Sequence, residues 1–119
     1  MPSKIQNEFG LVTIDNEVVA RIAGLAAMDC YGIVGMAAKS VKDGLVHLLK
    51  AESITKGVVI ANNGDAGITV DLHIIVEYGT NISAIADSLV STVQYKVEDS
   101  VGLKVEKINI FVEGVRVDN

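Results

Sequence analysis

Few side chains in this sequence have the types and the spacing that catalysis or metal binding requires. His47 and His73 are the only histidines, and Cys30 is the only cysteine. Neither histidine has a second histidine or a cysteine at the short spacing typical of metal ligands, so we interpret both as surface residues. Cys30 has no histidine beside it, and a free cysteine is often buried as a small hydrophobe. The residues therefore predict no catalytic group, no metal ligand and no cofactor site.

The carboxylates offer no acid–base pair either. Asp71 and Glu77 fall on the same side of an expected strand, six residues apart. At ~3.3 Å per residue they are separated by about 20 Å, whereas the paired carboxylates of glycoside hydrolysis lie within ~10 Å of each other. The chain also contains no phosphate-binding loop, nucleotide fingerprint or nucleophile elbow. We therefore expect the protein not to be an enzyme.

One short motif is a candidate binding loop. Gly32, Ile33, Val34 and Gly35 form a G-x-x-G sequence between two expected helices, an arrangement similar to the loop with which KH domains clamp a nucleic-acid backbone. The two central residues are apolar and the chain has a net charge of −5, although electrostatic attraction supplies most of the energy of non-specific binding to nucleic acids. The favoured interpretation is a tight connection between packed helices, with Ile33 and Val34 buried. An RNA-binding loop is kept as the alternative.

Length and composition narrow the class of protein. With 119 residues, half of them hydrophobic, the chain suits one domain with a sizeable core. We expect a flexible lead over residues 1–9 and a single domain over residues 10–119. The longest apolar runs fall well short of the ~20 residues that span a bilayer, and the polar N-terminus lacks the apolar centre of a signal peptide.

Cysteine content and charge indicate the compartment. A single cysteine suits the reducing cytoplasm. The acidic chain lacks the basic surface typical of proteins that bind nucleic acid or anionic lipid. We therefore expect a cytoplasmic protein without direct membrane insertion.

The elements that position these residues are organised around the segment from Ile68 to Glu98. Apolar and polar residues alternate from Ile68 to Tyr78, which predicts a strand with one buried and one mostly wet face. Asn81 can cap a following helix by accepting hydrogen bonds from the unpaired N–H groups of its first turn. The apolar stripe of that helix is Ile82, Ile85, Ala86, Leu89, Val93 and Val97. This strand and this helix can bury each other's apolar faces.

The same patterns place the other elements. In chain order they are a strand over Phe9–Ile14, a helix from Asp15 or Asn16 to Cys30, a shorter helix over Val41–Lys50, a strand over Gly57–Ala61 and a final strand over Lys104–Val117. The turn-rich residues 62–67 predict that the strand before them forms an antiparallel hairpin with the strand after them. The order β-α-α-β-β-α-β predicts an α+β fold, with one mixed sheet and the helices packed on one face.

Two patterns within these elements are more specific. The inward stripe of the first helix is Val19, Ile22, Ala23, Ala26 and Cys30, with Val18 and Leu25 widening it. In the final strand the apolar alternation shifts after Gly114, which predicts a bulge there.

Two large apolar residues are expected on the side of the sheet that the helices leave open. Ile75 is the one apolar residue on the wet face of its strand, and Phe111 stands between Asn109 and Glu113 in the final strand. If the two strands are neighbours, Ile75 and Phe111 form an apolar patch that can hold a partner. We expect self-association through this face, and a contact through the edge of the sheet is the alternative.

Several separated motifs carry a resemblance to a known family. In order they are Cys30–Met36 after an alanine-rich helix, Gly57–Val59, Ile74–Gly79 and Asn109–Val117. In these motifs the chain resembles the alkaline shock protein family of general and envelope stress proteins, over nearly its whole length from about Gly10 to Val117. It is most similar to the short, single-domain branch of Gram-positive bacteria, and it lacks the long charged tails of the stress-induced members.

The resemblance implies a non-enzymatic cytoplasmic protein with no catalytic residue and no cofactor. Some relatives self-assemble and collect beneath the membrane by binding a membrane-anchored partner. Members of the short branch tend to be encoded beside a dihydroxyacetone-kinase-like protein of fatty-acid phosphorylation. We therefore expect a scaffold of stress response and envelope homeostasis that forms homo-oligomers. Its expected protein partner is a membrane-anchored protein that recruits it to the membrane, or the dihydroxyacetone-kinase-like protein.

Overall fold

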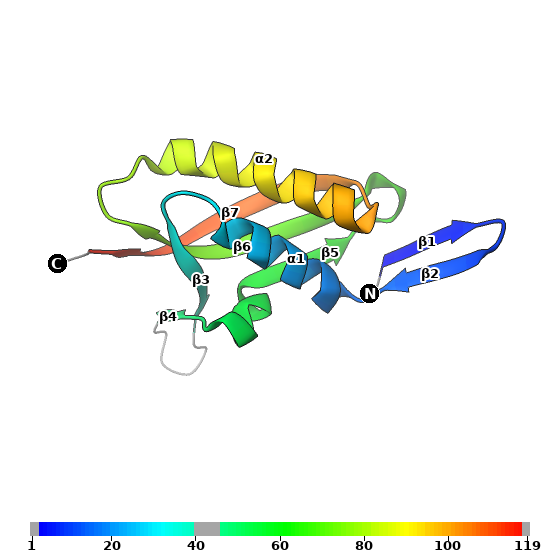
Figure 1. Cartoon of the computed structure of the whole chain (residues 1–119), viewed down its shortest axis with the longest axis horizontal. Coiled ribbons are helices and arrows are strands. Elements are labelled where there is room, and N and C mark those ends of the chain that lie inside the picture. The colour runs from blue at the N-terminus through cyan, green and yellow to red at the C-terminus, as the bar shows by residue number, and fades with distance from the viewer. Residues whose placement is uncertain (1–2, 40–45, 118–119) are drawn as a thin grey trace.

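In the computed structural model, which describes residues 3–39 and 46–117, two α-helices lie on one face of a mixed sheet and a separate hairpin extends from one end (Figure 1). The described elements in chain order are β1 (Ser3–Asn7), β2 (Gly10–Ile14), α1 (Asn16–Met28), β3 (Ile33–Lys39), β4 (Val46–Leu48), the 3₁₀ helix η1 (Ala51–Gly57), β5 (Val58–Asn62), the 3₁₀ helix η2 (Gly64–Ala66), β6 (Ile68–Glu77), α2 (Ile82–Val101) and β7 (Val105–Arg116). The α+β class and the packing of helices on one face of a mixed sheet are confirmed, but the strand expected over Phe9–Ile14 lies outside that sheet and pairs with β1.

Strand β6 is the centre of the sheet because other strands pair with it along both of its edges. The inward residues Ile68, Val70, Leu72, Ile74 and Val76 are all buried in the core. β7 runs parallel to β6 along the whole of one edge. β5 and β3 share the other edge, both antiparallel, at Ile68–Leu72 and at Ile74–Val76 respectively. β4 pairs with β3 on the side away from β6.

Helix α2 begins after Asn81, the capping residue that the sequence predicts. The Oδ1 atom of Asn81 accepts a hydrogen bond from the N–H of Ala84 at 3.0 Å, which caps the first turn. The helix ends at Gly102, whose φ of 77° is left-handed and whose N–H donates to the carbonyl of Glu98. Its buried stripe is Ile85, Leu89, Val93, Val97 and Val101. This stripe covers the inward face of β6 and β7.

Helix α1 lies close to its neighbours because its inward residues are small. The side chain of Asp15 accepts from the N–H of Glu17 and caps the helix. The buried residues are Val19, Ala20, Ala23, Gly24, Ala26 and Ala27. A Cβ atom at Gly24 would lie 3.3 Å from the Cδ1 atom of Ile54, so this position has no room for a side chain without movement of Ile54. Cys30 is buried, as predicted, and its thiol lies 3.6 Å from the carbonyl oxygen of Ala26.

The N-terminal lead is more ordered than the sequence predicts. Ser3–Asn7 forms strand β1, which pairs antiparallel with β2, so the expectation of a loose lead is wrong for these residues. The polar residues of β1 obscure the strand pattern, because only Ile5 among them is a large hydrophobe. The hairpin extends away from the body, beyond the N-terminal end of α1 (Figure 1).

The helix expected over Val41–Lys50 is wrong in its described part. Residues 46–48 form strand β4, which pairs with Ala37–Lys39, and the N–H of Leu49 donates to the carbonyl of Met36 at 2.9 Å. The first part of the expected helix, residues 41–45, falls outside the part of the chain that the structure describes. A short apolar run does not distinguish helix from strand by periodicity, and here the free edge of β3 supplies the hydrogen-bond partners.

Candidate interaction surfaces

The G-x-x-G motif begins a strand instead of joining two helices. Gly32 occupies a turn, and Ile33 opens β3 opposite Val76. Gly35 pairs with Ile75. The expected loop between two helices is therefore wrong, and with it the KH-like arrangement, because the backbone of the motif is engaged in the sheet. Its two central residues, which we expected to be buried, are half-buried.

Both glycines of the motif are explained by packing. Gly32 has a left-handed φ of 85°, and a Cβ atom there would collide with the side chain of Ile85 on α2. A Cβ atom at Gly35 would lie 2.7 Å from the Cδ1 atom of Leu48 on β4. The absence of side chains thus lets α2 and β4 approach β3 closely. The spacing of the two glycines serves the fold.

The sheet face opposite the helices carries Phe111, as predicted. β6 and β7 are neighbours, which was the assumption behind the expected patch. Phe111 stands opposite His73, and their rings are stacked with centroids 4.8 Å apart and an interplanar angle of 12°. Phe111 remains 42% exposed. A flat pair of rings is therefore presented to solvent on this face.

Ile75 differs from the prediction because it is only 9% exposed. It belongs to the open face, outside the core cluster under the helices. It lies in the central strand between Gly35 on β3 and Gly114 on β7, and a Cβ atom at Gly114 would lie 3.8 Å from its Cγ1 atom. Strands on both sides thus cover it, so of the two residues expected to form the patch it is Phe111 that is exposed on this face.

Polar side chains flank the stacked rings along β6 and β7. The Nδ2 atom of Asn109 donates to the Oδ1 atom of Asp71 at 2.8 Å. The Nδ1 atom of His73 lies 3.9 Å from the Oε2 atom of Glu113. The register shift after Val112 leaves Glu113 as the extra residue of a bulge next to Gly114, as the sequence predicts. The sequence places these residues on outward positions, but the pairing of His73 with Phe111 depends on a strand register that the sequence does not supply.

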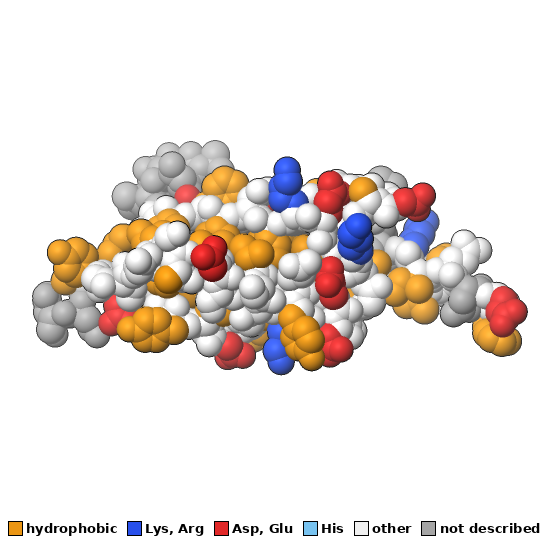
Figure 2. Space-filling view, turned by 90° about the horizontal axis from the view of Figure 1, so that it is seen from above, with side chains coloured by type: hydrophobic (Ala, Val, Ile, Leu, Met, Phe, Trp, Pro, Cys, Tyr) orange, Lys and Arg blue, Asp and Glu red, His pale blue; other side chains and the backbone are white. Residues whose placement is uncertain are grey.

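Helix α1 has a second apolar side that faces solvent. Val18 and Leu25, which were expected to widen the buried stripe, are 51% and 53% exposed. With Ile22 and Met28 they form what we call the outer stripe of α1. Two shallow hollows of about 360 and 240 Å³ adjoin along it and share Ile22 and Leu25. Figure 2 shows hydrophobic side chains gathered in a band on the face seen from above α2.

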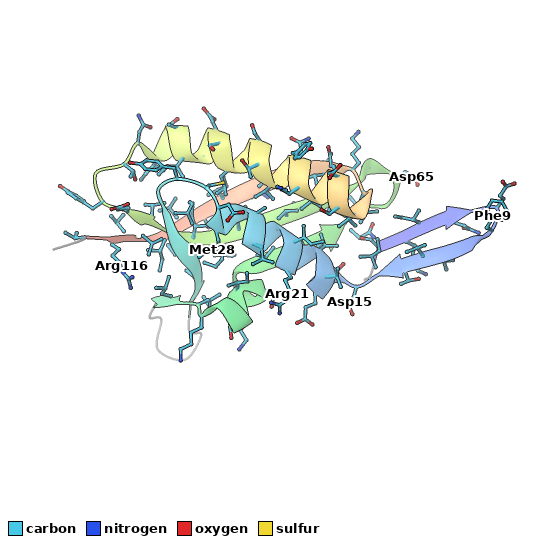
Figure 3. The ribbon with its side chains drawn as sticks, viewed as in Figure 1. Phe9, Asp15, Arg21, Met28, Asp65 and Arg116 are labelled. Carbon is cyan, nitrogen blue, oxygen red and sulfur yellow. The ribbon has the colours of Figure 1, made fainter. Side chains whose placement is uncertain are left out.

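The hairpin β1–β2, which we call the arm, also exposes apolar side chains. Phe9 at its tip, Leu11 and Val12 are 90%, 55% and 51% exposed. Figure 3 shows Phe9 far from the body, while Asp15, Arg21 and Met28 lie along α1. The base of the arm is held at Ser3, which is buried and whose Oγ atom accepts from the Nδ2 atom of Asn62 at 3.4 Å.

The described residues contain neither a metal-binding cluster nor a membrane-spanning helix. Among residues 3–39 and 46–117, no three side chains of His, Cys, Asp or Glu are grouped so that they could hold a metal ion. The side chain of His47 is outside the described part of the structure. Within the same ranges no helix has both the length and the apolar character needed to cross a membrane.

Comparison with known proteins gives a family for nearly the whole chain. The model of the alkaline shock protein 23 family, described as having a cell envelope-related function, matches residues 4–117. The uncharacterized protein YloU of Bacillus subtilis (strain 168) is 46% identical over 120 residues, covering 100% of this chain and 99% of that protein. The uncharacterized protein Spy1614 of Streptococcus pyogenes serotype M6 is 35% identical over 118 residues, covering 98% of this chain and 97% of that protein.

A longer relative carries a functional name. A protein of Streptococcus pyogenes serotype M3 named as a stress response regulator gls24 homolog is 32% identical over 110 residues. The match covers 90% of this chain and 59% of that protein. No solved structure matches significantly.

Proposed function

Because the chain belongs to the alkaline shock protein 23 family of cell envelope-related proteins, we propose that it is a non-enzymatic scaffold of the envelope stress response, acting through contacts with a protein partner and with copies of itself. The stress and envelope part of this role is supported by the family description and by the relative named as a stress response regulator. The scaffold part is supported by the apolar surfaces that the fold leaves uncovered.

The observation that carries the proposal is the open face of the sheet around Phe111. Aromatic side chains are enriched at the centres of protein interfaces, where they fill pockets of the partner. The stacking of Phe111 on His73 holds the ring in place before binding, which lowers the entropy cost of docking. The hydrogen-bonded pair Asp71–Asn109 beside it supplies a polar border.

The titratable residues of this face fit binding better than catalysis. Asp71 is engaged by Asn109, and His73 lies between the ring of Phe111 and the carboxylate of Glu113. Each of these groups pairs across the strands on an open surface, whereas catalytic groups converge on a concave pocket. We therefore propose that the protein performs no reaction and needs no cofactor.

The proposed site of action is the cytoplasm, with recruitment to the membrane by a partner. The two partner classes are a membrane-anchored protein and a dihydroxyacetone-kinase-like protein, both of which follow from the family resemblance. Chemical cross-linking in the native cell, followed by affinity purification and mass spectrometry, tests them directly. We expect one of these two classes to be enriched with the parent chain and lost with Phe111→Lys.

A matched control separates the sheet face from surface charge in general. Tyr95 on α2 is also an exposed aromatic residue, at 64% exposure, so Tyr95→Lys should leave the enrichment unchanged. Equal enrichment with the parent and Phe111→Lys would show that this face is not the binding site. Sedimentation at tens of micromolar tests the self-association half, which a strictly monomeric parent would contradict.

A further inference from the structure

The arm makes few contacts with the body of its own chain, and these lie at its base. A two-stranded hairpin alone is at best marginally stable in water, and this one contacts the body through its base at Ser3. Its strand pairing places Ile5 and Val12 on one face and Gln6 and Leu11 on the other. At the base, the face of Ile5 is turned toward the body near Gly102. The face of Leu11 is therefore the one available to another surface.

The outer stripe of α1 is a surface that its own chain leaves uncovered. A helix at the surface of a globular protein normally directs polar residues to solvent. Here Val18, Leu25 and Met28 are 51%, 53% and 40% exposed on one side of a helix of 13 residues. The arm points away from the α1 of its own chain (Figure 1), so it cannot fold back on its own stripe. A second copy can reach it.

The arm and the stripe agree in length. Each arm strand has five residues, or about 17 Å at ~3.3 Å per residue. Helix α1 has 13 residues, or about 20 Å at ~1.5 Å per residue. An arm that enters at the N-terminal end of another α1 would place Leu11 near Ile22 and Phe9 near Leu25. Large apolar residues then meet at both positions.

The charges of the arm and of the outer stripe are complementary when the arm lies in this same orientation. Lys4 is near the base of the arm and Glu8 is at its tip. Along the stripe, Asp15 and Glu17 come first, and Arg21 lies one turn further. Lys96 and Asp29 both line the second hollow. Asp29 follows the C-terminal end of α1, beyond the reach of the arm. An arm running from the N-terminal toward the C-terminal end of α1 thus opposes Lys4 to acidic groups and Glu8 to basic groups, and the reverse direction would oppose like charges.

We propose that two copies of this chain exchange arms, so that the Leu11 face and the tip of each arm lie along the outer stripe of the other copy's α1. The arm leaves its chain at the N-terminal end of α1, so a two-fold axis near these ends makes both contacts at once and closes a dimer. This inference rests on the proposed self-association and gives it an interface distinct from the sheet face.

Sedimentation equilibrium of the full chain tests the exchange with two neighbouring substitutions. Leu11→Ser should raise the dissociation constant of the dimer roughly a hundredfold, about tenfold for each of the two symmetric contacts. Val12→Ser is the matched control, because Val12 has nearly the same exposure on the opposite face of the arm. It should leave the constant unchanged. Circular dichroism of both variants checks that the body stays folded.

A charge exchange and a covalent trap test the orientation. Lys4→Glu should weaken the dimer, and adding Glu17→Lys should restore it. Under oxidation, a mixture of Phe9→Cys and Leu25→Cys chains, both with Cys30→Ala, should give mixed disulfide dimers. The pair Val12→Cys and Leu25→Cys should not.

The outcomes separate this inference from the proposed function. A parent that assembles while Leu11→Ser assembles equally well overturns the arm exchange and leaves self-association through another surface. A dimer weakened by Val12→Ser but not by Leu11→Ser overturns it as well. A parent that is monomeric at tens of micromolar overturns both the exchange and the proposed self-association.

Discussion

Ile75 and Phe111 show how two residues with the same sequence pattern can have opposite environments. Both occupy outward positions of neighbouring strands. Ile75 lies in the central strand and is covered from two sides, whereas Phe111 lies in a strand that pairs on one side only within the described residues. Alternation gives the face of a residue, and the neighbours of its strand determine its burial. The neighbours come from strand order, which alternation does not contain.

This difference predicts unequal costs for the same substitution. Ile75→Lys brings an ammonium group to a nearly buried site, so we expect the free energy of unfolding to fall by at least about 2 kcal/mol. Phe111→Lys leaves the core intact and loses a ring stacking of ~0.5–1.5 kcal/mol. Urea denaturation of the two variants measures both values. Similar losses would mean that Ile75 is not covered in solution.

Gly32 gives a second test at the residue scale. Gly32→Ala introduces a Cβ atom into the side chain of Ile85, in addition to the strain of a left-handed φ. Gly79 has nearly the same φ, 88° against 85°, but open space around its Cβ position. We therefore expect Gly32→Ala to destabilise the fold by about 1–3 kcal/mol more than Gly79→Ala, the usual range for overpacking.

Ile85→Val supplies the control, because it shortens the side chain that the new Cβ atom would meet. Combined with Gly32→Ala, it should recover part of the lost stability, as measured by thermal unfolding. A double variant whose two losses simply add would indicate that Gly32 and Ile85 do not interact.

At the scale of elements, the sequence predicts best those segments whose signals are local. Helix α2 begins after Asn81 and ends at Gly102, as the capping residues indicate. The hairpin of β5 and β6 follows from the turn residues between them. β1 was missed because its residues are mostly polar, and β4 was missed because a strand of three residues depends on the free edge of β3 for its hydrogen bonds. A segment of three to five residues is too short for hydrophobic periodicity to identify it as a strand.

The cap of α2 carries a measurable share of stability. Asn81→Ala removes the acceptor for the N–H of Ala84, and we expect it to lower the free energy of unfolding by ~1 kcal/mol. Ser91→Ala, at an exposed position in the middle of the same helix, should be neutral or slightly stabilising because alanine is the better helix former. Chemical denaturation in urea compares the two.

At the scale of the whole molecule, the sequence predicts the class and the layers, and it mistakes the route of the chain between α1 and β5. The inward stripes of β6 and α2 are long enough to define a core without knowledge of strand order. The candidate site was predicted in part. Phe111 was placed on the correct face, whereas the outer stripe of α1 and the arm emerge only when the burial of each residue is known.

Two truncations should have unequal effects on the molecule. Removal of residues 1–14 takes away the arm, whose single contribution to the core cluster is the half-buried Ile14, so we expect the rest still to unfold cooperatively. Removal of β7 takes away Val105 and the half-buried Ile108 and Ile110 from the core. We expect that variant to lose cooperative unfolding, as followed by far-ultraviolet circular dichroism. A cooperative transition without β7 would contradict this view of the sheet.

The parallel pairing of β6 with β7 has a consequence for biosynthesis. β7 follows every other described element along the chain, so a ribosome releases it last among them. Until then, one entire edge of the central strand presents unpaired N–H and C=O groups to other chains. The core also lacks the apolar side chains that β7 contributes. The sheet therefore cannot be completed before β7 has left the ribosome. Most of its exposure to aggregation and to chaperones falls in the interval before β7 emerges.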